Sequence, residues 1–300
     1  MDAREPCRRR HRPSAHGGPR ESGSRRDFSP ACDSLYPTLV NEFAHYLLAK
    51  RTVDDRALDR RVLERLRREL AGVQSPAIVD VGAGIGTGLE RLLDWNVVTE
   101  PTYIAVEEDT GLVEIARSRL DGRGQTELVT STLADFASDT GNLARFDLVI
   151  AHAFLDIVDL ASALNSLVSL ARPGGLLYFP ITFDGETVFE PAREDDEAIL
   201  SRYHASMGEI GNSKTGRRLF HALSSEPVDV LEMGSSDWIV RPESGGYPHD
   251  EAFFLEFVIG MIERTVGKAA EDWASVRRKQ IEDCQLLYIA HQLDCLARKR

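Results

Sequence analysis

Three glycines and an aspartate alternate with apolar residues in the segment Asp80-Val-Gly82-Ala-Gly84-Ile-Gly86. Glycine tolerates positive φ angles and lets a ligand approach the backbone closely. The segment follows a short apolar run, 77–81, and precedes an amphipathic stretch, 87–93, so we expect a turn between a strand and a helix. Such a turn either serves the local geometry alone or cradles a ligand.

A dinucleotide site is the natural competitor for this turn. The dinucleotide fingerprint is G-x-G-x-x-G/A, which requires Gly or Ala at the sixth position. Counted from Gly82, the sixth residue is Thr87, and the third glycine comes one position early, at Gly86. The spacing therefore argues against a dinucleotide.

The D-x-G-x-G-x-G form resembles motif I of the class I (Rossmann-like) S-adenosylmethionine (SAM)-dependent methyltransferases. Glu107 ends the second predicted strand, where that family places an acid on the ribose hydroxyls, and Asp135-Phe136 follows the third, where the family contacts adenine. Arg172-Pro-Gly-Gly-Leu176 before the fifth strand also resembles the family. The resemblance implies SAM as cofactor, with these cofactor-binding residues: Asp80, Gly82, Gly84, Gly86, Glu107, Asp135, Phe136 and His152.

Short apolar strands alternate with amphipathic helices from residue 77 onward. Parallel strands need crossover helices, so this order predicts an α/β fold built on a parallel sheet. By analogy with the family, we expect a Rossmann-like, seven-stranded, mostly parallel sheet with helices on both faces and an antiparallel last strand. The strands are predicted at 77–81, 103–106, 127–130, 146–151, 176–179, 228–240 and 285–297.

The remaining chain predicts a tail and a cap around a single methyltransferase domain, 31–300. Residues 1–30 are rich in Arg, Pro, Gly and Ser without periodicity, which is typical of a disordered tail. Helices at 35–50 and 54–70 fall in an N-terminal cap segment, 31–75. Ligands of open α/β sheets bind beyond the carboxyl ends of the strands, where we also expect the insertions 182–213 and 241–280. So much additional chain indicates a covered pocket for a small molecule, or alternatively a homodimer contact.

Methyl transfer requires an oriented nucleophile and, for a hydroxyl or amine, removal of a proton. His152 follows the fourth strand and is a candidate base, although it could equally pack against the cofactor. Tyr203 and His204 lie in the second cap segment and are further catalytic candidates, unless they occupy a plain helix surface. The acidic clusters of the chain place consecutive carboxylates on different sides of a helix, so we predict no metal site.

The formal net charge of −12 argues against a nucleic-acid partner. Residues 1–30 hold eight Arg and four acids, so the rest of the chain carries −16. Without an apolar run of transmembrane length, we predict a cytoplasmic enzyme with no membrane partner. The predicted function is SAM-dependent methyl transfer to a small molecule. The alternatives are a SAM-binding protein without transferase activity and, less favoured, a nucleic-acid methyltransferase.

Overall fold

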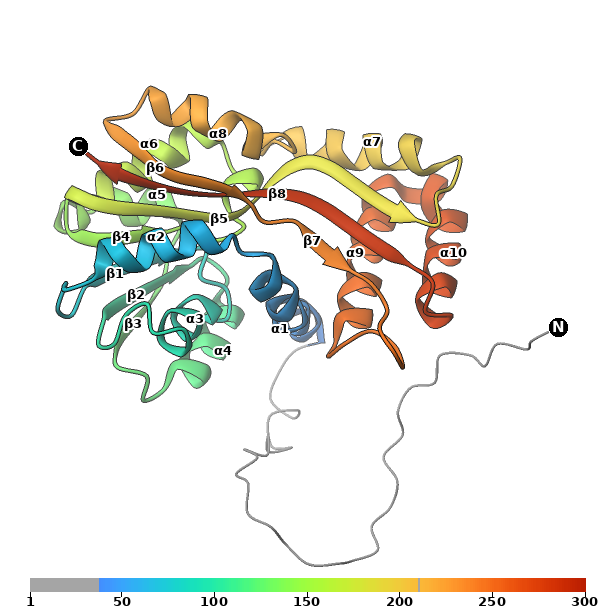
Figure 1. The fold of residues 1–300 in the computed structure, drawn as a ribbon, viewed down its shortest axis with the longest axis horizontal. Coiled ribbons are helices and arrows are strands. Elements are labelled where there is room, and N and C mark those ends of the chain that lie inside the picture. Colours follow the sequence, from blue (N-terminus) through green and yellow to red (C-terminus); the bar gives the residue numbers. More distant parts are fainter. Residues whose placement is uncertain (1–37, 210) are drawn as a thin grey trace, which may run out of the picture.

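The computed structural model describes residues 38–209 and 211–300, so the predicted tail 1–30 lies outside the described residues. A twisted sheet runs through this part of the chain, with helices on both sides (Figure 1). Its strands are β1 (Ala77–Val81), β2 (Thr102–Glu107), β3 (Gln125–Thr130), β4 (Phe146–Ile150), β5 (Ala171–Glu190), β6 (Val228–Ser235), β7 (Trp238–Val240) and β8 (Leu287–Lys299).

The strand order β3-β2-β1-β4-β5-β8-β6 confirms the predicted Rossmann-like sheet. β1 to β5 pair in parallel, and β8 is antiparallel to both β5 and β6. The predicted strand 228–240 is interrupted, and its short second part, β7, pairs separately with β8. The sheet therefore has eight strands in the described part of the chain, where seven were expected.

Two sets of helices cover the two faces of the sheet. Ile78 and Leu148 pack with α2 and α3 on one face, whereas Val79 and Val149 pack with α6 and α8 on the other, as the alternation of side chains along a strand requires. The helices are α1 (Thr38–Ala57), α2 (Arg60–Leu70), α3 (Thr87–Asp94), α4 (Thr110–Leu120), α5 (Leu133–Ser138), α6 (Leu160–Leu170), α7 (Asp196–Ser206), α8 (Thr215–Ser224), α9 (Glu251–Val266) and α10 (Glu271–Glu282). Short 3₁₀ helices are η2 (Thr140–Asn142), η3 (Leu155–Ile157), η4 (Met207–Glu209) and η5 (Gly267–Ala270).

The boundary between the first two helices differs from the prediction. Residue 54 was placed at the start of the second helix, but α1 continues to Ala57, and α2 begins after Asp59. The Asp59 carboxylate caps α2 by accepting hydrogen bonds from the amides of Arg61 and Val62. Asp54 therefore lies in the last turns of α1, where it faces other parts of the molecule.

β5 and β8 extend far beyond the parallel part of the sheet and carry the cap (Figure 1). The two strands stay paired to Glu190 and Leu287. α7, α9 and α10 pack around this extension, with α9 in contact with both other helices (Figure 1). These elements share a second apolar core with α1 and β7, whereas α2, which was predicted as part of the cap, packs against the parallel sheet. In the described residues, no helix combines the length and the apolar character that a membrane crossing requires.

Candidate active site

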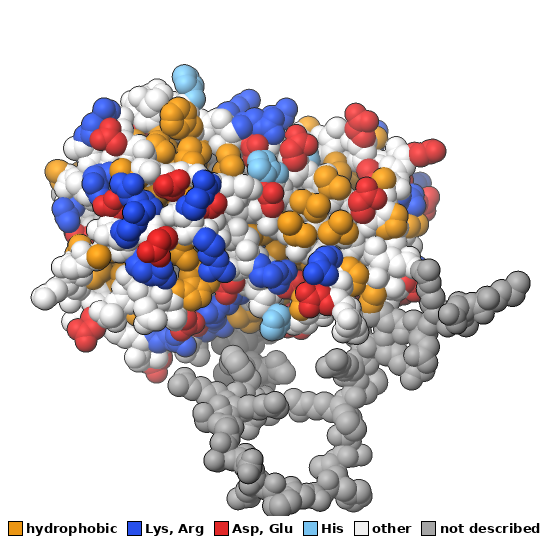
Figure 2. Space-filling model, in the orientation of Figure 1, with side chains coloured by type: hydrophobic (Ala, Val, Ile, Leu, Met, Phe, Trp, Pro, Cys, Tyr) orange, Lys and Arg blue, Asp and Glu red, His pale blue; other side chains and the backbone are white. Residues whose placement is uncertain are grey.

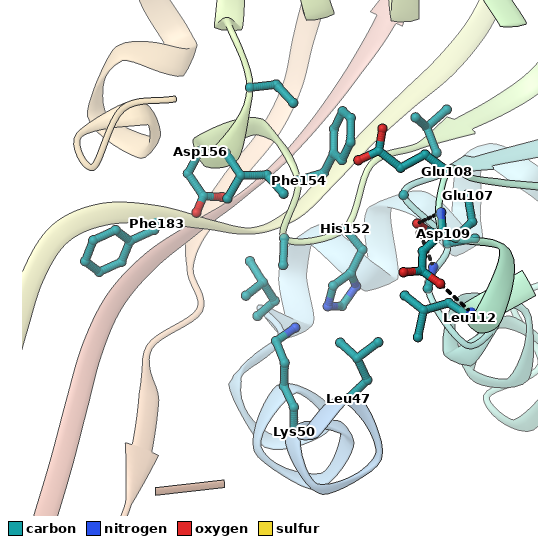
Figure 3. A pocket seen from close by; sticks show the side chains of 18 of the residues that line it. Leu47, Lys50, Glu107, Glu108, Asp109, Leu112, His152, Phe154, Asp156 and Phe183 are labelled. Atoms are coloured by element: carbon teal, nitrogen blue, oxygen red, sulfur yellow. Dashed lines mark hydrogen bonds between the residues drawn. The ribbon is translucent and has the colours of Figure 1, made fainter. Parts of the chain in front are cut away.

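A cavity of about 790 Å³ lies where the carboxyl ends of the parallel strands meet the cap. This volume falls within the range of roughly 300–1,000 Å³ that is typical of small-molecule sites. Figure 3 shows Glu107 and Asp109 at one end, Asp156 and Phe183 at the other, and His152 and Lys50 between them. The glycine turn and the cap thus contribute to one shared cavity.

The glycine turn folds back over the end of β2. The amides of Gly82 and Ala83 donate to the carbonyl of Val106, at 2.9 and 3.1 Å. Gly82 and Gly84 both adopt positive φ angles, and a Cβ at Gly82 would lie 2.6 Å from the ring of Phe154. Only glycine fits this position without moving a ring that itself lines the cavity.

Glu107 is fixed beside this turn by two backbone amides. Its Oε2 accepts a hydrogen bond from Gly84 at 2.9 Å, and its Oε1 accepts one from Asp109 at 3.1 Å (Figure 3). A carboxylate offers about four lone-pair positions, so two amides leave acceptor capacity for hydroxyl groups of a ligand. The charge is thus oriented before any ligand binds.

Asp80 lies at the base of the same end and is buried. Its Oδ2 accepts a hydrogen bond from the hydroxyl of Tyr103, and its Oδ1 has no hydrogen-bond partner in the described part of the chain. Burial raises the pKa of Asp80 to about 7, against the opposing effects of Tyr103 and Arg91. An enclosed carboxyl oxygen without a partner on the cavity wall leaves an acceptor, or a donor when protonated, for a polar ligand.

Asp54 lies between the two ends of the cavity and binds four side chains there. Its Oδ2 lies 2.9 Å from Lys50 Nζ, 3.2 Å from an Arg91 guanidinium nitrogen and 3.0 Å from His152 Nε2. Its Oδ1 accepts a hydrogen bond from the indole of Trp238 at 2.9 Å. Burial opposes ionisation, but Lys50, His152 and Arg91 together hold the pKa of Asp54 well below its usual range.

His152 is neutral in this setting. Burial and the charge of Arg91 lower its pKa to about 4, although Asp54 acts in the opposite direction. Because Asp54 is ionised and only accepts, Nε2 must carry the proton, which leaves the lone pair on Nδ1. The described residues contain no cluster of three or more His, Cys, Asp or Glu side chains suited to holding a metal ion.

Comparison with known proteins agrees with this geometry. A family model described as a methyltransferase domain matches residues 79–177, which span β1 to the middle of β5. This stretch contains the glycine turn, Glu107 and His152. The match identifies a methyltransferase domain over residues 79–177.

Solved structures support the fold. A protein of Bacillus halodurans C-125 named as a candidate methyltransferase is 15% identical over 79% of this chain and 98% of that chain, with a TM-score of 0.53. The YcgJ protein of Bacillus subtilis is 13% identical over 81% of this chain and 99% of that chain, with a TM-score of 0.52. No curated protein sequence matches the chain.

The structure places three predicted cofactor residues away from the cavity lining. Asp135 is exposed and bonds to Thr132 at the start of α5, and Phe136 is buried against Phe146. Gly86 begins α3 and packs against Leu120 of α4. Their roles toward SAM stay predictions, and at the place expected for the adenine contact the cavity is lined instead by residues 131–134.

Of the two catalytic candidates in the second cap segment, 182–213, one lines the cavity and the other does not. Tyr203 lines the cavity, whereas His204 lies behind Phe183, with its Nε2 3.1 Å from the hydroxyl of Thr187. Burial lowers the pKa of His204.

Sequence reasoning missed Lys50, Asp54 and Asp156 in this cavity. Only the i, i+4 spacing of Lys50 and Asp54 on one helix face could have indicated that they interact.

Proposed function

We propose that this chain transfers the methyl group of SAM to a small-molecule acceptor bound at the cap end of the cavity. The observation that carries the proposal is that the glycine turn and the cap side chains line one continuous cavity. A cavity of about 790 Å³ that the cap partly covers suits a small acceptor.

The residues at the glycine-turn end fit SAM. Glu107 would accept the two ribose hydroxyls, and the backbone at Gly82 and Gly84 would approach the amino-acid part of SAM. The unpartnered Oδ1 of Asp80 would bind a polar group of the same part. When bound, SAM supplies an electrophilic methyl group on a sulfonium. The chain's own contribution is to orient the acceptor toward that methyl group and to exclude water.

His152 is proposed to receive the acceptor's proton at Nδ1. Asp54 holds the ring through Nε2 and so determines which nitrogen is free. A neutral imidazole beside a fixed carboxylate is a common arrangement for a general base. Tyr203, on the cap wall of the same cavity, is proposed to position the acceptor.

The surface gives no support to the nucleic-acid alternative. The arginines of α2 make the most basic helix, but Arg65 and Arg67 pair with Glu69 and Glu64 at 2.6 and 2.5 Å. On the face shown in Figure 2, basic and acidic side chains are interspersed, with no uninterrupted basic patch. A duplex-binding surface needs concentrated positive charge.

The first prediction concerns the cofactor. Glu107→Gln should weaken binding of S-adenosylhomocysteine about tenfold or more, because hydrogen bonds to a charged group are worth roughly 1.5–3 kcal/mol. Isothermal titration calorimetry measures this directly. The matched control is Glu114→Gln, since Glu114 lies on the exposed side of α4, outside the cavity.

Failure of the wild-type protein to bind S-adenosylhomocysteine would contradict the proposal. Equal affinity of the two variants for S-adenosylhomocysteine would show that Glu107 does not contact the cofactor. Transfer itself is tested by screening metabolites for release of S-adenosylhomocysteine. Binding without release for every acceptor would favour the alternative of a SAM-binding protein without transferase activity.

A further inference from the structure

The cap end of the cavity is lined by aromatic rings from five different elements. Tyr46 comes from α1, Phe183 from β5, Tyr203 from α7, Trp238 from β7 and Tyr288 from β8. The three phenol hydroxyls make no hydrogen bond to any described residue. Tyr46 stacks on Phe254 and Phe257, at centroid distances of 5.6 and 4.3 Å, so it offers the cavity its hydroxyl and not its ring face. Phe183 and Tyr203 make only tilted contacts with His204, which leaves a face of each ring to a ligand.

Asp156 is a buried carboxyl at this aromatic end, where the other carboxylate, Asp54, is already paired with Lys50 and Trp238. Asp156 lies on η3, directly after the loop that carries His152, and its carboxyl group points toward Phe183 (Figure 3). Only 9% of the residue is exposed, and its Oδ1 has no hydrogen-bond partner in the described residues. Asp156 lies close enough to Tyr203 to raise the pKa of its hydroxyl, after the larger effect of burial.

The cations of the cavity are already engaged elsewhere. Lys50 donates to Asp54 at 2.9 Å, and its Nζ lies 5.3 Å from the ring centroid of Trp238. Arg91 donates to Asp54 and Asp55. These two cations and two carboxylates balance one another, and no cation of the described residues forms an ion pair with Asp156.

Burial raises the pKa of Asp156 to about 6, so its ionised form is disfavoured here, and a ligand that supplies a positive charge would stabilise it. Aromatic faces attract the same kind of ligand, because the ring quadrupole is negative above and below its plane. A carboxylate ligand would be repelled by Asp156, and an alcohol would satisfy a lone pair but leave the charge uncompensated.

We propose that the acceptor is an organic amine whose positively charged ammonium group binds Asp156 beside the rings of Phe183 and Tyr203 and so anchors the molecule, while a separate nucleophilic atom of the same molecule receives the methyl group and gives its proton to His152. This inference rests on the proposed function, and it names the substrate class of the same cavity. Asp156 acts as the specificity-determining residue, and the rings exclude water from the ion pair.

The test uses matched compounds that differ only in charge. The full chain, saturated with S-adenosylhomocysteine, is titrated by calorimetry and by thermal shift with sets such as 2-phenylethylamine, 2-phenylethanol and phenylacetate. For the wild type, the ammonium member of each set should bind at least tenfold more tightly than the alcohol. Asp156→Asn should reduce this ratio to about one.

Two further variants keep the result interpretable. Asp229→Asn makes the same chemical change at an exposed position of β6 and should retain the wild-type ratio. Tyr203→Leu removes one ring without changing a charge, and it should lower the ratio of ammonium to alcohol affinity severalfold. This variant tests the proposal even where Asp156→Asn proves unstable. Affinity for S-adenosylhomocysteine should stay within about twofold of the wild type in all three variants.

The proposal is overturned if ammonium compounds bind no better than their alcohols or do not bind at all. It is equally overturned if Asp156→Asn keeps the ammonium preference. Loss of S-adenosylhomocysteine binding by the wild type would instead contradict the proposed function, so the two failures are distinguishable.

Discussion

Asp54 connects four elements of the molecule through one carboxylate. Lys50 comes from its own helix, Arg91 from α3, His152 from the loop after β4 and Trp238 from β7. Removing one partner of a buried ion pair typically costs roughly 3–5 kcal/mol, because the other charge stays buried. The free energy of this cluster thus fixes α1 over the cavity and holds His152 in one orientation.

The ring of His152 should stay neutral, with its proton on Nε2, between pH 8 and about pH 5. Burial and Arg91 lower its pKa to about 4 from the ordinary 6.5, so the folded state binds fewer protons than the unfolded state below pH 6.5. His152 therefore reduces stability progressively as the pH falls from 6.5 through 4. Long-range ¹⁵N–¹H NMR spectra report the tautomer, with His152→Gln identifying the signal. A ring that becomes protonated near pH 6.5 would contradict this arrangement.

Residue patterns predicted the charged end of the site better than its centre. The position of Glu107 followed from its place at the end of the second predicted strand, where the resembling family carries an acid, and the structure places it beside the glycine turn. The role of Asp54 could not be predicted from the sequence, because its partners His152 and Trp238 are 98 and 184 residues away in the chain. Asp135 was a reasonable candidate by position, yet a local hydrogen bond with Thr132 orients its side chain along the start of α5.

At the scale of elements, β5 shows why the strand was predicted too short. Pro180 lacks an amide hydrogen and ends the apolar run, which is typical of a strand terminus. The structure accommodates it at a bulge, where Ile181 adopts a φ of 57° and donates its amide to the buried carboxylate of Asp294 at 2.8 Å. The strand then continues into the cap, because β8 supplies both the pairing and this carboxylate.

The glycines of the turn should separate into two classes on substitution. Gly86→Ala should lower the melting temperature while S-adenosylhomocysteine affinity stays within about threefold, because the new Cβ would lie 2.7 Å from Leu120, outside the cavity lining. Gly82→Ala should lose about tenfold or more in affinity, because Phe154 must move within the cavity. Thermal unfolding and calorimetry measure the two effects.

Gly72→Ala is the matched control for both variants. Gly72 has a φ of 85°, but no atom lies within 4 Å of a Cβ built there. Its substitution introduces backbone strain of about 1–2 kcal/mol without a clash. If Gly86→Ala lowered the melting temperature no more than Gly72→Ala does, the clash with Leu120 would not contribute to the loss of stability.

At the scale of the whole molecule, cofactor and acceptor ends belong to two packed units joined by β5 and β8. The sequence predicted where additional chain gathers, because topology dictates which edge of a parallel sheet the insertions reach. It did not reveal that α1, α7, α9 and α10 share one core, since that core forms only through contacts between distant segments. The shape of the acceptor end therefore depends on how firmly the cap is anchored.

Asp196 supplies that anchor at the end of the cap. Its Oδ1 accepts hydrogen bonds from the indole of Trp273, at 2.7 Å, and from the guanidinium of Arg277, whose side chain is fully buried. Asp196→Ala should lower the melting temperature by about 5 °C or more, because it leaves a buried cation without its carboxylate. Asp195→Ala is the control: it removes only a half-exposed pair with Arg193, which is worth about 1 kcal/mol or less.

Asp196→Ala should also distinguish the two ends of the cavity. The anchor holds in place the cavity walls that carry Tyr203 and Tyr288. The glycine turn and Glu107 are instead held by the parallel strands. We therefore expect acceptor binding to weaken severalfold while S-adenosylhomocysteine affinity changes by less than about twofold, both measured by calorimetry below the melting temperature. Equal losses at both ends would mean that the cap and the sheet respond as one cooperative unit, and that the cap does not independently determine which acceptor binds.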